Sequence, residues 1–196
     1  MLYQRILIAL LTLFVIACTT DELYLEDSIV ISDPEIPSLP IYSELGYNTF
    51  GVRYNRESIT GNSYDYPLTV MVENGATSLI FKGSQSYSNK FTFTFKLSEA
   101  MASREALLTL GGKKYNLDSD NIAVSLVENN EEKSLEIISG EFEIKNAQKM
   151  LVDDEEKGVI LSGVFQFQAK VDGEPASFSY GRFDVVIGYS NFYNLD

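Results

Sequence analysis

The sequence predicts an all-β fold, either an antiparallel β-sandwich or a partly open barrel, from its alternating residues, turn dipeptides and aromatic composition. Residues 91–97 (FTFTFKL) alternate apolar and polar side chains, which places the apolar ones on one face of a strand. Asn74-Gly75 and Asp172-Gly173 separate such runs and favour tight hairpins, because their residues tolerate positive φ. The chain has 12 Phe, 12 Tyr and no Trp, and Phe and Tyr favour pleated, half-buried surfaces.

Apolar residues at every second position predict further strands along the chain. We expect these strands at residues 68–73, 76–82, 106–110, 113–117, 122–126, 142–144, 165–171 and 178–187. The Gly111-Gly112 and Asn129-Asn130 dipeptides are predicted to turn two further pairs of strands. Residues 98–105 (SEAMASRE) have helical character, for one or two turns at most.

Two features predict local irregularities within the strands. Phe178 and Tyr180 occupy even positions, whereas the apolar residues from Phe183 to Ile187 occupy odd ones. Keeping all of them on one face requires one extra residue near Gly181-Arg182, which predicts a β-bulge. The segments 139–144 (SGEFEI) and 162–167 (SGVFQF) share an S-G-x-F-x-apolar pattern, whose glycine indicates a bend or a close backbone approach.

The first 17 residues (MLYQRILIALLTLFVIA) are typical of an export signal. One basic residue, Arg5, precedes about a dozen apolar residues, too few for the roughly 20 that span a bilayer but suitable for a signal-peptide core. Residues 15–18 (VIAC) resemble a lipobox, in which the signal is cleaved before a cysteine that is then lipidated. The resemblance implies that Cys18, the one cysteine of the chain, carries a lipid anchor that holds the protein on a membrane.

Residues 18–43 are predicted to form a lipidated, extended tether in front of an all-β domain at residues 44–196. Proline recurs in the segment 33–40 (DPEIPSLP), which excludes a helix and favours an extended spacer. Acidic residues soon after Cys18, at Asp21 and Glu22, resemble the signal that exports Bacteroidota-type lipoproteins to the outer face of the outer membrane. The expected location is therefore the outer membrane, facing the cell surface, with the periplasmic face as the alternative.

Composition excludes several classes of function. The formal net charge of −13 repels phosphates, so nucleic acid is not an expected partner. The chain has no His, and His is the commonest general base and zinc ligand. Because the chain has no His and its single cysteine is Cys18, Ser-His-Asp and Cys-His hydrolases are both excluded, and we expect no cofactor and no metal.

Acidic clusters and tyrosines are the candidate functional residues. Residues 153–156 (DDEE) and 118–121 (DSDN) offer oxygen ligands for Ca²⁺. The first cluster is more typical of a solvated hairpin loop, and the second of an ordinary turn. Aromatic side chains near the two ends of the domain are candidates for sugar or protein contacts. They are Tyr42, Tyr47, Tyr54, Tyr64, Tyr66, Tyr189, Phe192 and Tyr193.

The stretch Gly158–Ile187 (GVILSGVFQFQAKVDGEPASFSYGRFDVVI) resembles the C-terminal end of small, uncharacterised Bacteroidota-type cell-envelope lipoproteins. In these, an S-G-x-F-x-F-x-A strand is followed by a G-R-F-D-V strand. Residues 48–52 (NTFGV) are similar to the first strand of such domains. The resemblance implies an all-β envelope lipoprotein and carries no activity with it.

Three functional hypotheses follow. The first is a non-catalytic binding or accessory lipoprotein that engages an envelope protein or an extracellular glycan, indicated by a flat apolar patch or a concave Tyr-lined groove respectively. The second is a structural surface-fibre or adhesin-like subunit, which requires an open edge strand. The third is a carboxylate-dependent hydrolase, which requires two buried, converging acids in a cleft.

Overall fold

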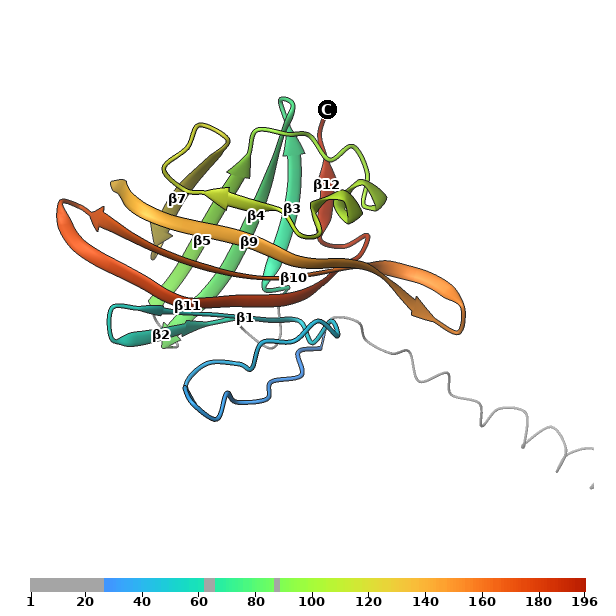
Figure 1. Cartoon of the computed structure of the whole chain (residues 1–196), viewed down its shortest axis with the longest axis horizontal. Coiled ribbons are helices and arrows are strands. Elements are labelled where there is room, and N and C mark those ends of the chain that lie inside the picture. Colours follow the sequence, from blue (N-terminus) through green and yellow to red (C-terminus); the bar gives the residue numbers. More distant parts are fainter. Residues whose placement is uncertain (1–26, 62–65, 87–88) are drawn as a thin grey trace, which may run out of the picture.

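The protein is all-β, as a computed structural model shows for residues 27–61, 66–86 and 89–196 (Figure 1). Its strands form one sheet that curls into a half-barrel, in the order β6-β9-β10-β11-β1-β2-β4-β5-β7-β8, with β3 between β4 and β12. All pairs are antiparallel except β3 with β12. The elements are β1 (Thr49–Tyr54), β2 (Glu57–Thr60), β3 (Leu68–Glu73), β4 (Ala76–Ser86), β5 (Asn89–Leu97), the 3₁₀ helix η1 (Glu105–Leu110), β6 (Lys114–Asn116), β7 (Ile122–Glu128), β8 (Glu131–Lys133), β9 (Leu135–Val152), β10 (Glu155–Val171), β11 (Glu174–Ile187) and β12 (Phe192–Asn194).

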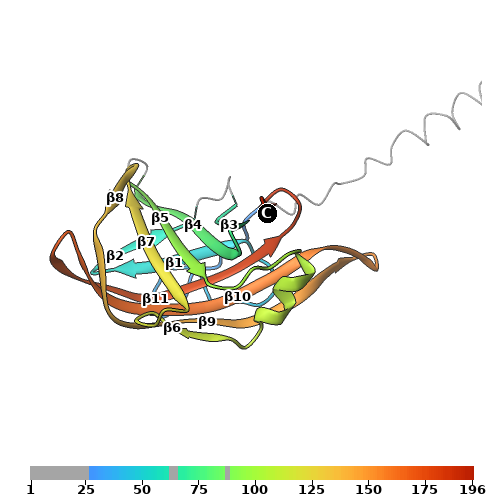
Figure 2. The same ribbon diagram turned by 90° about the horizontal axis from the view of Figure 1, so that it is seen from above.

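The curled sheet has two walls that face each other across the core. β9, β10, β11, β1 and β2 form one wall, and β3, β4, β5 and β7 cross behind it at a steep angle (Figures 1 and 2). Ser134 joins β8 to β9 and carries the chain from the second wall to the first. No helix among the described residues is long and apolar enough to cross a membrane.

Phenylalanine rings fill the space between the walls. Phe167 and Phe178 stack with ring centroids 4.2 Å apart, and Phe95 stacks on Phe142 at 4.5 Å. Offset and edge-on contacts of this kind each add about 0.5–1.5 kcal/mol to the burial of the rings. The buried rings are Phe50, Phe81, Phe91, Phe93, Phe95, Phe142, Phe165, Phe167, Phe178 and Phe183.

Glycines on the inner face give these rings their room. Gly163 pairs with Phe183 and Gly181 pairs with Phe165 across β10 and β11. A Cβ added to Gly163 would lie 2.5 Å from Phe183 Cζ, and one added to Gly181 would lie 2.6 Å from Phe165 Cε2. A Cβ on Gly140 would come within 2.2 Å of Phe167 Cβ. The S-G-x-F pattern therefore marks close approaches, as expected from the sequence.

The predicted bulge of the last strand is present in β11. The register shifts between Phe165 and Phe167 on β10, so that Phe178 and Phe183 both face the core. The extra residue lies at Ser179-Tyr180, just before the predicted Gly181-Arg182. Gly181 is held in register beneath the ring of Phe165, which leaves Tyr180 to adopt the left-handed conformation, with φ of 55°.

Most predicted turns are confirmed, and one pair of strands was predicted wrongly. Asn74-Gly75, Asp172-Gly173 and Asn129-Asn130 each join two strands with both residues at positive φ. Residues 105–110, however, form η1 instead of a strand before Gly111-Gly112. Leu107 and Leu110 are both buried, at a spacing of three that brings side chains of a 3₁₀ helix onto one face. The helix expected at 98–105 is also wrong, since that segment is irregular up to Glu105.

The described part of the predicted tether, residues 27–43, folds back on the domain (Figure 1). A bridge pairs Ser32 with Pro40, and Leu39 is buried. A Cβ on Gly51 would lie 2.7 Å from Pro40 Cδ and 3.1 Å from Leu39 Cδ2, so this glycine lets the segment lie directly on β1. The extended spacer expected from the prolines therefore differs from the structure here; Cys18 lies outside the described residues.

Asp184 holds residues 45–47, which come just after this segment. Asp184 is 1% exposed, and its carboxylate accepts hydrogen bonds from the backbone N–H groups of Leu45 at 3.2 Å, Gly46 at 2.9 Å and Tyr47 at 3.0 Å. The hydroxyl of Ser162 donates to it at 3.0 Å. Successive N–H groups of this kind form a natural anion-binding turn, and here the anion belongs to β11.

Gly163→Ala is expected to lower the free energy of unfolding by about 1–3 kcal/mol or more, the usual cost of overpacking a core. Its Cβ would meet a backbone atom, the Glu143 carbonyl oxygen, at 2.2 Å, and a backbone atom yields less readily than a side chain. The control is Gly188→Ala, whose nearest neighbour, the Lys157 carbonyl oxygen, is 3.9 Å away. Urea denaturation measures both variants, and equal midpoints would contradict the role given to Gly163.

Candidate binding site

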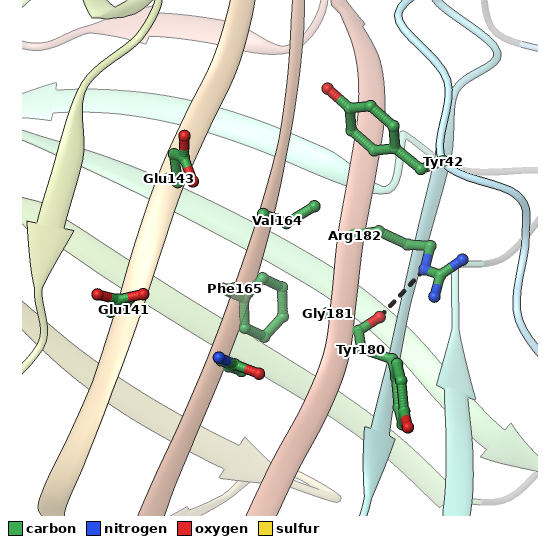
Figure 3. A pocket seen from close by; sticks show the side chains of 9 residues that line it. Tyr42, Glu141, Glu143, Val164, Phe165, Tyr180, Gly181 and Arg182 are labelled. Carbon is green, nitrogen blue, oxygen red and sulfur yellow. Dashed lines mark hydrogen bonds between the residues drawn. The ribbon is translucent and has the colours of Figure 1, made fainter.

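A concavity of about 500 Å³ lies on the outer face of β9, β10 and β11 (Figure 3). It faces outward because its side chains alternate along the strands with the buried rings of Phe142 and Phe183. Its volume falls within the range of about 300–1,000 Å³ that is common for small-molecule sites. The lining residues are Tyr42, Glu141, Glu143, Val164, Phe165, Gln166, Tyr180, Gly181 and Arg182.

Tyr180 forms one end of the concavity and Tyr42 the other (Figure 3). Tyr180 is 53% exposed, because the bulge turns it away from the core that receives Phe178 and Phe183. A left-handed backbone is rare for an aromatic residue and costs roughly 1–2 kcal/mol. Strain of this kind concentrates at functional sites, and here its result is an aromatic ring presented to solvent.

Arg182 joins the bulge to the N-terminal segment. Its Nε donates to the Tyr180 carbonyl oxygen at 3.1 Å, and its Nη1 donates to the Asp33 carboxylate and to the Pro40 carbonyl oxygen. The side chain of Arg182 is 12% exposed and that of Asp33 is 15% exposed. The hydrogen bond from Arg182 lowers the pKa of Asp33 below its ordinary value of 3.8. Arg182 is therefore a positioning residue whose charge is already neutralised.

Tyr42 is fixed by a network within the N-terminal segment and β9. Its hydroxyl donates to Glu44 Oε1 at 2.7 Å, and Asn146 donates to Glu44 Oε2 at 3.1 Å. Burial, together with the Glu44 carboxylate, raises the pKa of Tyr42 well above its ordinary value. The hydroxyl therefore stays protonated at neutral pH, and its oxygen keeps free lone pairs.

Two carboxylates line the β9 side of the concavity (Figure 3), and the amide of Gln166 lines its β10 side. Glu141 forms an ion pair with Lys114 at 2.9 Å, and Glu143 forms one with Lys145 at 2.9 Å. The exposed side chain of Gln166 makes no hydrogen bond with the described part of the chain. Its amide is thus available to a ligand as both donor and acceptor.

The acids at the concavity do not have the arrangement that the hydrolase hypothesis requires. Glu141 and Glu143 project from one strand on the same side, each beside a lysine, whereas a glycosidase places two carboxylates on opposite sides of the scissile bond. The oxygens of the buried Asp184 already accept hydrogen bonds from backbone N–H groups and from the Ser162 hydroxyl. In the concavity, we therefore find groups that can bind a ligand and no opposed acid pair.

The predicted acidic clusters lie in turns away from this concavity. Asp153 and Asp154 turn the β9–β10 hairpin, both at positive φ, and the hairpin projects from the rest of the sheet (Figures 1 and 2). Residues 118–121 lie in the connection from β6 to β7. Within the three described ranges, no group of three or more His, Cys, Asp or Glu residues could hold a metal ion.

The structure separates the aromatic residues that the sequence grouped together. Of that set, Tyr42 lines the concavity. Tyr54 stacks on Phe178 at 4.7 Å, and Tyr189 lies under the Arg104 guanidinium, 3.6 Å from the ring centroid. Tyr47, Tyr66, Phe192 and Tyr193 line no part of the concavity, and Tyr64 lies outside the described residues.

Sequence reasoning missed Tyr180, which it placed on the core face with Phe178. The signal that could have found it is the change of phase at Gly181, because the residue displaced by a bulge can face outward.

No family model, no curated protein and no solved structure matches this chain.

In an NMR titration, the carboxyl carbon of Asp33 is expected to titrate below pH 3.8, and in Arg182→Gln its midpoint should rise towards that value. A depressed folded-state pKa means that the pair stabilises the docked segment above the unfolded pKa of about 3.9 and loses this effect as the pH falls through the folded pKa. Asp172 is the internal control, since the Ser134 N–H and Lys133 lower its pKa independently of Arg182. An unchanged Asp33 midpoint in Arg182→Gln would refute the assignment.

Proposed function

We propose that this protein is a non-catalytic glycan-binding lipoprotein of the cell envelope, and that the concavity between Tyr42 and Tyr180 is its binding site. The observation that carries the proposal is the exposed ring of Tyr180, presented by a strained bulge at the end of a concave polar surface. Sugars offer an apolar ring face together with many hydroxyls, and tyrosine matches both through its flat face and its polar tip.

The polar groups of the site support a sugar ligand more than a protein partner. Gln166 and the carboxylates of Glu141 and Glu143 line the same concavity as the tyrosines. These groups suit hydroxyl partners, and sites of this type use a few placed polar groups for specificity. A protein partner would favour a flat apolar patch, whereas this surface is hollowed and rimmed by charge.

The fibre-subunit hypothesis receives less support from the sheet edges. β6 and β8, the two ends of the strand path, have three residues each and carry charged side chains such as Lys114 and Glu131. Short, charged strands of this kind oppose the addition of a further strand, and the part of β9 that β6 leaves unpaired carries charged residues such as Glu136, Lys145 and Lys149. We therefore propose binding in place of strand donation as the principal function.

Cys18 completes the proposal, because lipidation there would hold the site at the membrane. The described chain begins at residue 27, nine positions after Cys18. Its first part contains Tyr42, which lines the concavity, and Asp33, which forms an ion pair with Arg182. The anchor-proximal segment would thus be a wall of the binding site as well as a connection to the membrane.

Tyr180→Gly is expected to weaken glycan binding by at least about tenfold, which corresponds to roughly 1.4 kcal/mol. Glycine adopts positive φ without strain, and this relief offsets its entropy cost, so stability should change by less than about 1 kcal/mol. The control Tyr189→Gly removes an 82% exposed ring outside the concavity and should bind normally. A glycan array followed by titration calorimetry measures the effect, and equal affinities for both variants would exclude Tyr180 from the site.

Cys18→Ala is expected to abolish incorporation of labelled fatty acid and to release the protein from the membrane fraction, since the acyl chains provide the anchor. Metabolic labelling and fractionation test this, with Tyr180→Gly as a variant that should still be labelled. Continued labelling of Cys18→Ala would disprove lipidation at that residue.

A further inference from the structure

We infer that the concavity selects glycans that carry no anionic group and rejects those bearing carboxylate, sulfate or phosphate. The inference rests on the proposed glycan-binding function and extends it to the class of glycan. It follows from the charges and hydrogen-bonding groups that face the site.

The charges that a ligand meets on β9 are negative. Glu141 is exposed and Glu143 is half-buried, and both line the concavity. Their partners Lys114 and Lys145 do not line it. An anionic ligand would therefore approach two carboxylates before it met either ammonium group, and like charges in close contact are strongly unfavourable.

Arg182 is the one cation among the residues that line the concavity, and its charge is already paired with the Asp33 carboxylate. Its Nη1 donates hydrogen bonds to the Asp33 carboxylate and the Pro40 carbonyl oxygen, and its Nε donates one to the Tyr180 carbonyl oxygen. Figure 3 shows the guanidinium turned towards the N-terminal segment and away from Glu141 and Glu143. An anionic ligand would therefore have to compete with the Asp33 carboxylate for this guanidinium.

The hydrogen-bonding groups of the site favour a ligand that donates. The carboxylates only accept, and the Tyr42 hydroxyl already donates its proton to Glu44, so its oxygen is left as an acceptor. Gln166 and the Tyr180 hydroxyl make no hydrogen bonds with described residues and can both donate and accept. Sugar hydroxyls supply the donors that this set requires, whereas an ionised acid group supplies none.

The test uses the wild-type protein on an array that presents acidic oligosaccharides in matched pairs, each as the free uronate and as its uncharged methyl ester, beside neutral glycans. We expect binding to uncharged glycans and, within each bound pair, at least about tenfold weaker binding of the uronate, or roughly 1.4 kcal/mol. Equal binding of both members would overturn the selectivity and leave glycan binding standing. Absence of binding to every glycan would overturn the proposed function and this inference together.

The double variant Glu141→Gln/Glu143→Gln tests the cause. It leaves Lys114 and Lys145 unpaired, so the preference for the ester over the uronate should fall by about tenfold or more, and more strongly at low salt. The control is Glu136→Gln, on the same strand. The Glu136 carboxylate that it removes forms an ion pair with Lys170 outside the concavity. A preference that is unchanged in the double variant, or equally reduced in the control, would overturn the assignment to these two carboxylates.

Discussion

The close packing of phenylalanine rings over glycines is the constraint on which the rest of this structure depends. The inner face of a curled sheet offers less room than a flat one, and ten rings must share it. Gly163 and Gly181 leave their Cβ positions to the rings of Phe183 and Phe165 on the paired strand, a device that lets neighbouring strands curve without losing core volume. Because Gly181 is locked in this way, the extra residue of β11 must be accommodated before it, and Tyr180 is turned outward. The position of the candidate site is therefore a consequence of how the core is filled.

Hydrogen bonds to two carboxylates, Asp184 and Asp33, then attach residues 27–47 to this scaffold. Asp184 binds three successive backbone N–H groups of residues 45–47 from within the protein, and Arg182 binds Asp33 at the surface. A buried carboxylate is stable there because its oxygens accept hydrogen bonds from these N–H groups and from the Ser162 hydroxyl. Because Tyr42 belongs to this part of the chain, the two tyrosines at the ends of the site are about 140 residues apart in sequence. The same contacts neutralise Arg182, which gives the concavity its acidic, acceptor-rich character.

Local features of the structure were predicted well, and features that depend on distant contacts were not. The alternation of residues 91–97 and the Asn74-Gly75 turn depend on side-chain direction and on positive φ, both of which a few residues determine. The segment 105–110 was predicted as a strand, because its apolar spacing did not reveal that Leu107 and Leu110 would both reach one core. The prolines of residues 33–40 excluded a helix, but the nearby sequence could not show that Leu39 would pack over Gly51. Lipidation of Cys18 and the envelope location stay predictions.

The sequence by itself determined the all-β class, most strand positions and the existence of a bulge in the last strand, because each is encoded in the period of nearby residues. It also named Tyr42 among the candidate residues, although without its neighbours. Only the tertiary structure decided that Tyr180 faces solvent, that Arg182 forms an ion pair with Asp33, and that Tyr42 and Tyr180 line the same concavity. These outcomes depend on which strands become neighbours when the sheet curls and on where the rings fit, and such long-range packing has no signature in the local pattern of residues.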